Sequence, residues 1–255
     1  NLCAVVAEGK NGRIYISPDD EQRIIANVDK PTEIPEAALP KNPRDFKTPN
    51  YGMMNYSDLF TNRQLTALTT FSSLVAEAQA KAEADAVAAG VVNDHIALSA
   101  GGSGARAYGE AVGVYLAFVI DKMTDYNSSI CSWNPPREGL RNTFGRQAIP
   151  MVWDYAEANP FSNSSGCFDN MAEWVTKCIS ELPANQISEV SQFDAQSDCG
   201  LRNIMVSSDP PYYDNIGYAG LALYKKEMQQ QTPYVTLVDT GDAIQGAPIG
   251  TLSDG

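Results

Sequence analysis

The most constraining feature of the sequence is a stiff turn that follows a short apolar run. Residues 202–206 are predicted to form a buried strand, and Asp209-Pro210-Pro211-Tyr212 follows after two serines. Because consecutive prolines fix φ at about −65° and remove two N–H donors, the turn is rigid and lined by acceptors. An amine in the turn would meet the Asp209 carboxylate and the Pro210 carbonyl, and the Tyr212 ring could stack on a flat base. An ordinary turn at the end of a strand is the alternative interpretation.

The same four residues resemble the catalytic motif of amino-group DNA methyltransferases. The wider chain, over about residues 1–219, resembles the adenine-specific DNA methylases that carry a zinc ribbon and a large insertion. The segments that carry this wider resemblance are residues 4–9, 12–15, 42–52, 101–108, 125–129, 141–161 and 206–219. The resemblance implies methyl transfer from S-adenosylmethionine to the N6 amine of an adenine that has been extruded from DNA.

The resemblance also assigns roles outside the turn. Asp194 follows an expected strand over residues 187–193, where Rossmann-like methyltransferases place a group near the adenine of the cofactor. A plain turn is the alternative for Asp194. Residues 141–161 would lie beside the reaction centre, and a packed strand–loop element with Trp153 in the core is the alternative. The implied partner is DNA, and the reaction would depend mainly on positioning and desolvation.

The order of expected elements predicts an α/β fold, with a partial Rossmann-like methyltransferase sheet, a large helical insertion and an N-terminal β-hairpin. Asn11-Gly12 between two β-prone runs predicts the hairpin. Four segments are expected along the chain. They are a hairpin with an irregular connection (1–50), the helical insertion (51–135), the α/β segment with the Asp-Pro-Pro-Tyr motif (136–219) and a helix–strand tail (220–255).

Three helices are expected from the spacing of apolar residues. The first begins at a capping box formed by Thr61 and Gln64, and Gly90 ends it. The second covers residues 105–124, and the third covers residues 168–182. The second is expected to be buried along one face, which consists of Tyr108, Val112, Tyr115, Leu116, Val119 and Met123.

A glycine-rich segment precedes the second helix. Gly102, Gly104 and Ala107 have the Gly-x-Gly-x-x-Ala spacing of a dinucleotide-binding loop. Residues 96–100 are too short and polar for a convincing preceding strand, and an acidic residue at the end of a second strand is missing. The favoured interpretation is therefore a flexible entry to a helix.

The net charge of −13 argues against a free-standing DNA-binding module, because phosphate contacts require Lys and Arg. A DNA enzyme can be acidic overall where its basic residues cluster. Two clusters are present, namely Lys41, Arg44 and Lys47, and Arg137, Arg141 and Arg146. Ordinary solvation of the surface is the alternative for both.

Five cysteines without a Cys-x-x-Cys pair predict reduced thiols. An apolar run of about 18 residues and a basic-then-apolar leader are both missing, which predicts a cytoplasmic protein without membrane association.

The last part of the chain has a different resemblance. Residues 220–255 are similar to the early part of calcineurin-like metallophosphoesterases such as 5′-nucleotidases, in which Asp242 would bridge two metal ions. The Asp-x-His of that family is missing, because the sole histidine is His95. The glycine-rich cofactor loop of the methylases is also not identifiable. The alternatives to an active methyltransferase are therefore a noncatalytic truncated or fused protein and a metal-dependent phosphoesterase.

Overall fold

The computed structural model describes residues 2–42, 45–145 and 148–183. It also describes ten single positions, which are Gln192, Asp194, Gly200, Arg202, Ser207, Ser208, Lys226, Gln230, Val238 and Asp239. The chain divides into two compact units, Asn1–Pro183 and Ala184–Gly255. The boundary falls inside the segment 136–219 that was expected to form one α/β element.

The first unit begins with the predicted hairpin. Strands β1 (Val5–Gly9) and β2 (Gly12–Ile16) pair antiparallel. Gly12 has a φ of +127°, a conformation that glycine adopts without steric cost, so the Asn11-Gly12 signal acts at the position where the turn requires it. The hairpin prediction is confirmed.

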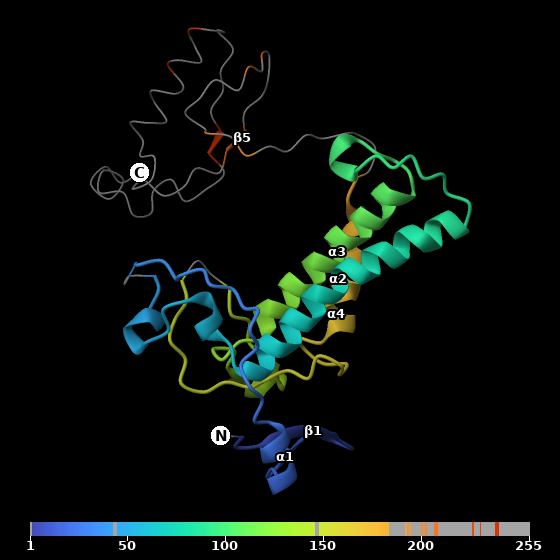
Figure 1. The fold of residues 1–255 in the computed structure, drawn as a ribbon. Helices are drawn as coiled ribbons and strands as arrows, with labels where there is room; N and C mark the ends of the chain where they lie inside the picture. Colours follow the sequence, from blue (N-terminus) through green and yellow to red (C-terminus); the bar gives the residue numbers. More distant parts are fainter. Residues whose placement is uncertain are drawn as a thin grey trace. The chain divides into compact units, whose positions relative to one another are not determined.

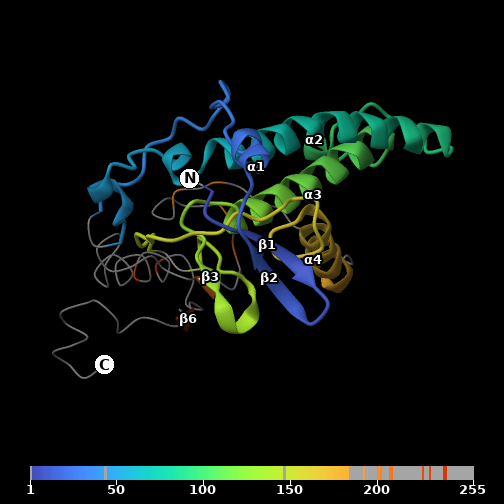
Figure 2. The same ribbon diagram turned by 90° about the horizontal axis from the view of Figure 1, so that it is seen from below.

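The hairpin lies beside a second, smaller one (Figure 2). Strands β3 (Trp133–Asn134) and β4 (Gly139–Leu140) pair antiparallel across the 3₁₀ turn η4 (Pro135–Arg137). The indole N–H of Trp133 donates a hydrogen bond of 3.0 Å to the Tyr15 hydroxyl, which joins the two hairpins.

Short helical turns interrupt the connection that follows the first hairpin. Helix α1 (Asp20–Ile25) begins at a capping box in which Asp19 and Gln22 bond each other's backbone N–H groups. The 3₁₀ turns η1 (Thr48–Tyr51) and η2 (Tyr56–Leu59) follow. The sequence predicted an irregular connection up to residue 50, but it predicted neither α1 nor the two 3₁₀ turns.

Helix α2 (Asn62–Ala88) is the first long helix. Its capping box is the predicted one, because the Thr61 hydroxyl accepts from the N–H of Gln64 at 3.2 Å and the Gln64 side chain accepts from the N–H of Thr61 at 2.9 Å. Gly90 follows the helix with a φ of +93°. The predicted start and end of this helix are confirmed.

Helix α3 (Ala105–Tyr126) runs antiparallel to α2 at close range, after the 3₁₀ turn η3 (Leu98–Ala100). A Cβ atom at Gly109 would lie 2.8 Å from the backbone carbonyl oxygen of Gln79. The contact therefore requires glycine, and it determines which side of α3 faces α2.

The predicted buried face of α3 was wrong in its first half. Tyr108 is 57% exposed and Tyr115 also faces solvent, whereas Val119 and Met123 are buried as expected. The buried residues of the helix are Ala105, Ala107, Gly109, Gly113, Val119 and Met123. Small residues occupy the interface because the two backbones approach closely, and the aromatic side chains are displaced outward.

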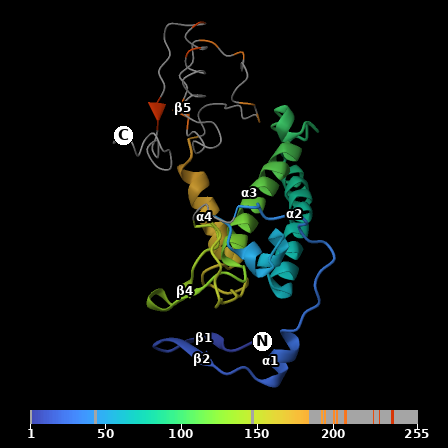
Figure 3. The ribbon, with the colours of Figure 1, turned by 90° about the vertical axis from the view of Figure 1, so that its left-hand side faces the viewer.

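Helix α4 (Phe168–Glu181) packs against the other side of α3, so α3 lies between α2 and α4 (Figures 1 and 3). The buried cluster shared by the three helices consists of Leu68, Val119, Met123 and Met171. The rings of Phe71 and Phe168 stack with centroids 5.3 Å apart and planes at 9°. A separate cluster lies under the irregular segments and consists of Leu39, Leu59, Ile130 and Ile149.

In the second unit, the described residues contain one strand pair. Strands β5 (Ser207–Ser208) and β6 (Val238–Asp239) pair in parallel. Parallel strands require a long crossover connection, which is typical of α/β folds. Within the described positions each sheet has two strands, and most of the expected methyltransferase sheet lies outside them.

Candidate functional site

The predicted catalytic turn, Asp209-Pro210-Pro211-Tyr212, lies outside the described residues, as does Asp242. Asp194, the predicted cofactor contact, is described and exposed to solvent. The first unit contains the segments 42–52, 125–129 and 141–161, for which the sequence predicted methylase-like roles.

Two of these segments, residues 42–52 and 141–161, meet although about a hundred positions separate them. Phe46 and Ile149 form a parallel bridge. The N–H of Ile149 donates to the carbonyl of Asp45 at 2.9 Å, and the N–H of Lys47 donates to the carbonyl of Ile149 at 3.1 Å. Since Ile149 also belongs to the buried cluster, the two segments are fixed to each other through the core.

A third segment of the resemblance, residues 125–129, holds this assembly at the end of α3. The Asp125 carboxylate accepts from the N–H of Phe144 at 2.7 Å and from the side-chain amide of Asn142 at 3.2 Å. The backbone carbonyl of Asp125 accepts from the N–H of Thr143 at 2.7 Å. One acidic residue therefore sets the path of the chain at the start of the 141–161 segment.

A buried polar network lies beneath that contact. The hydroxyl oxygens of Ser128 and Thr143 are 2.8 Å apart, and the Cys131 sulfur lies 3.1 Å from the Thr143 hydroxyl. All three side chains are buried. Buried hydroxyls and thiols that find partners impose a specific geometry, because an unmade hydrogen bond in the interior is costly. Sequence reasoning did not identify this network, since the three residue types carry no distinctive spacing.

Two aromatic side chains protrude from the assembly. The rings of Tyr51 and Trp153 have centroids 5.0 Å apart and planes at 84°. Tyr51 is 55% exposed and Trp153 is 76% exposed. The alternative in which Trp153 belongs to the core was therefore wrong. Tyr51 ends η1, and Gly52 follows it with a φ of +92°, so the turn that presents the tyrosine requires glycine.

Members of both basic clusters lie on the segments of this assembly. Lys47 directly follows the bridging residue Phe46, and Lys41 and Arg141 are exposed on the segments that flank the bridge. Arg44 and Arg146 lie outside the described residues. The structure thus brings together residues 42–52 and 141–161, which carry basic residues and are far apart in the sequence.

An ion pair fixes the far end of the 141–161 segment. The Arg63 guanidinium donates to both Glu157 carboxylate oxygens, at 2.8 and 2.7 Å, and to the carbonyl of Ala26. Its hydrogen bonds with Glu157 are the main reason that the pKa of Arg63 is raised. The pair ties the start of α2 to residues on two distant segments.

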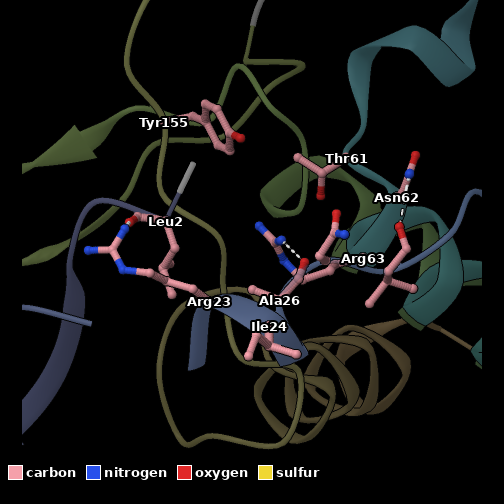
Figure 4. A pocket seen from close by; sticks show the side chains of 10 residues that line it. Leu2, Arg23, Ile24, Ala26, Thr61, Asn62, Arg63 and Tyr155 are labelled. Carbon is pink, nitrogen blue, oxygen red and sulfur yellow. Dashed lines mark hydrogen bonds between the residues drawn. The ribbon is translucent and has the colours of Figure 1, made fainter. Parts of the chain in front are cut away.

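A polar hollow of about 540 Å³ lies next to this ion pair. Figure 4 shows the guanidinium of Arg63 directed at the backbone of Ala26, with the ring of Tyr155 across the hollow. The side chain of Arg23 also lines it and donates to the carbonyl of Leu2 at 3.2 Å. Both guanidinium groups therefore donate hydrogen bonds within the protein, Arg63 to a carboxylate and a carbonyl and Arg23 to a carbonyl.

The glycine-rich segment before α3 is closed by an acidic side chain. The Asp94 carboxylate accepts from the N–H groups of Ile96 at 3.0 Å and of Ser103 and Gly104 at 3.2 Å each. These bonds, led by the one from Ile96, lower the pKa of Asp94. A Cβ at Gly102 would lie 2.2 Å from the carbonyl oxygen of Ile96. The glycines thus permit close packing, and the helix terminus that a phosphate would occupy already binds a carboxylate.

Within the described residues, no helix is long and apolar enough to cross a membrane, and no group of three or more acidic, histidine or cysteine side chains is arranged to hold a metal ion. No family model, curated protein or solved structure matches the chain.

Proposed function

We propose that this chain is an S-adenosylmethionine-dependent N6-adenine DNA methyltransferase or a catalytic part of one. The observation that carries the proposal is the joining of residues 42–52, 125–129 and 141–161. These segments carry the methylase resemblance, and the bridge between Phe46 and Ile149 and the hydrogen bonds of Asp125 hold them together. Segments with a shared role at one site are expected to meet in the fold.

The chemistry would reside in the turn after β5. The Asp209 carboxylate and the Pro210 carbonyl would accept the two N–H groups of the target amine. Pro211 would keep the turn rigid, and the Tyr212 ring would stack on the extruded base. These contacts would hold the amine nitrogen in a fixed direction, and most of the rate enhancement would come from this positioning.

S-adenosylmethionine would supply an activated methyl group when bound. Asp194 is the described residue that the resemblance assigns to its binding, and it is exposed to solvent. The position of β5, directly before Asp209 and paired in parallel with β6, agrees with a site at the carboxyl ends of parallel strands.

The test is transfer of a labelled methyl group from S-adenosylmethionine to DNA by the full chain, together with calorimetric titration of the cofactor. The proposal expects binding and transfer by the wild-type chain. Asp209→Ala should abolish transfer while leaving cofactor binding in place. If the chain binds neither S-adenosylmethionine nor its demethylated product at millimolar concentration, it is not catalytic by itself and the truncated or fused noncatalytic protein replaces this proposal.

A further inference from the structure

We propose that the exposed pair of Tyr51 and Trp153 is a stacking site for unpaired bases, and that its partner is single-stranded DNA. The geometry of the pair is the first argument. Because the two planes stand at 84°, each ring leaves at least one face uncovered by the other. Tyr51 and Trp153 are each more than half exposed, so much of the surface of the pair is open to solvent. A flat aromatic face is the chemical partner of a nucleobase face.

The backbone is anchored near both residues of the pair. Tyr51 closes a 3₁₀ turn whose first residue, Thr48, is fully buried. Trp153 lies four residues after Ile149, which is bridged to Phe46 and buried in the core. Anchored backbone reduces the conformational entropy that the pair would lose when a ligand stacks on it.

Charge selects nucleic acid as the occupant. Residues 41–54 and 137–155, the two segments that carry the pair, contain six of the 18 basic residues of the chain and three of its 31 acidic residues. The rest of the chain is strongly acidic. The described basic residues of the two segments are Lys41, Lys47, Arg137 and Arg141, all exposed, and the described acidic ones are Asp45, Glu138 and Asp154. Since the rest of the chain is far more acidic, these segments are where phosphates are repelled least.

The exposed aromatic rings favour single-stranded DNA over duplex DNA. In a duplex the base faces are covered by their neighbours, and only edges are available to a protein. An aromatic platform can stack only on a base that has left the stack or belongs to a single strand. The inference deepens the proposed function, since it names a contact for unpaired DNA bases, but single-strand binding can be measured independently of catalysis.

The experiment measures fluorescence anisotropy of a labelled oligothymidine of about a dozen nucleotides, a length within the range of single-strand binding sites. Trp153→Ala should weaken binding by roughly fivefold to a hundredfold, as removal of one stacking ring does. Tyr51→Ala should weaken it in the same direction, and Trp153→Phe should restore most of the affinity. Lys41→Ala should reduce the slope of log affinity against log salt by about 0.7.

Trp174→Ala is the matched control, because Trp174 lies on α4, is 62% exposed and is not part of the platform. The affinity of the Trp174→Ala variant for oligothymidine should equal that of the wild type. Since Trp153 is exposed, its replacement should leave the thermal midpoint unchanged, and this separates lost binding from lost folding. Equal affinities for the Trp153→Ala and wild-type chains, or tighter binding to a hairpin duplex than to the single strand, would overturn the proposal.

The two proposals fail separately. Asp209→Ala should abolish methyl transfer without changing oligothymidine affinity, and Trp153→Ala should lower that affinity without changing the binding of S-adenosylmethionine. Absence of cofactor binding would end the proposed function while leaving the stacking site to be judged by its own titration.

Discussion

The Arg63 guanidinium and the Glu157 carboxylate meet through two hydrogen bonds, although 94 residues separate them in the chain. The same guanidinium donates to the carbonyl of Ala26. Three segments are therefore joined at the start of α2, and the exposed Trp153 lies four residues before this anchor. Trp153 therefore lies between two anchored points of the chain, the bridge at Ile149 and the ion pair at Glu157.

Arg63→Ala is expected to lower the free energy of unfolding by about 1–2 kcal/mol. The pair has bidentate geometry and partial burial, with side-chain exposures of 35% and 21%, so it exceeds a surface ion pair but not a fully buried one. Urea denaturation measures the change. Lys81→Ala is the control, because the Lys81–Asp85 pair is exposed and contributes about 0.5 kcal/mol or less. Equal effects of the two substitutions would show that the anchor acts as an ordinary surface pair.

Gly109→Ala is expected to destabilise the first unit by about 1–3 kcal/mol, as overpacking of a close contact does. The new Cβ would lie 2.8 Å from the carbonyl oxygen of Gln79, so the two helices must separate. On helix propensity alone the substitution would be favourable by about 1 kcal/mol, so the sign of the result is informative. Thermal or urea unfolding gives the value. Val114→Ala, an exposed position on the same helix, should have little effect, and a stabilised Gly109→Ala variant would contradict the close-contact argument.

Thr143→Val should cost about 1–2 kcal/mol of stability, because the buried hydroxyls and thiol around it lose a partner while the shape of the side chain is kept. Thr70→Val is the matched control, since the Thr70 hydroxyl is exposed and bonds only its own helix at Thr66. Both variants are compared by urea denaturation at neutral pH. Indistinguishable midpoints would mean that the Ser128–Thr143 network adds nothing to stability.

Asp94 predicts a pH dependence at the start of α3. Hydrogen bonds from Ile96, Ser103 and Gly104 lower its pKa below the ordinary value of 3.8. Its contribution to stability is therefore complete above about pH 3.8 and is lost as the pH falls through the lowered pKa. Amide NMR signals of Ser103 and Gly104 should titrate with a midpoint below 3.8. In the Asp94→Asn variant this step should vanish, and a midpoint above the ordinary value would refute the assignment.

Local signals predicted much of the first unit. The capping box of Thr61 and Gln64, the Asn11-Gly12 turn and Gly90 each specify their structure within a few residues, so the hairpin and the limits of α2 could be read from sequence. The buried face of α3 could not be read from the sequence. Hydrophobicity favours burial of Tyr108, whereas the close approach of the two helix backbones at Gly109 determines which side of α3 is buried.

At the candidate site, too, local sequence patterns were predictive and contacts between distant segments were not. The basic clusters were visible in the sequence, but the segments that carry them are joined by the pairing of Phe46 with Ile149, which no local pattern encodes. The Asp94 contact was missed, although an Asn-Asp turn about ten residues before the glycines was a possible signal. The roles of Asp209 and Tyr212 stay predictions, because both lie outside the described residues.

The position of Asp94 also bears on how glycine-rich motifs are interpreted. A nucleotide approaching the start of α3 would compete with an anion that the chain itself carries, and a tethered group has a millimolar or higher effective concentration at its own site. Weak nucleotide binding there would be suppressed without any steric barrier. Glycines with the spacing of a nucleotide-binding loop can therefore precede a helix whose N-terminus binds a carboxylate of the same chain.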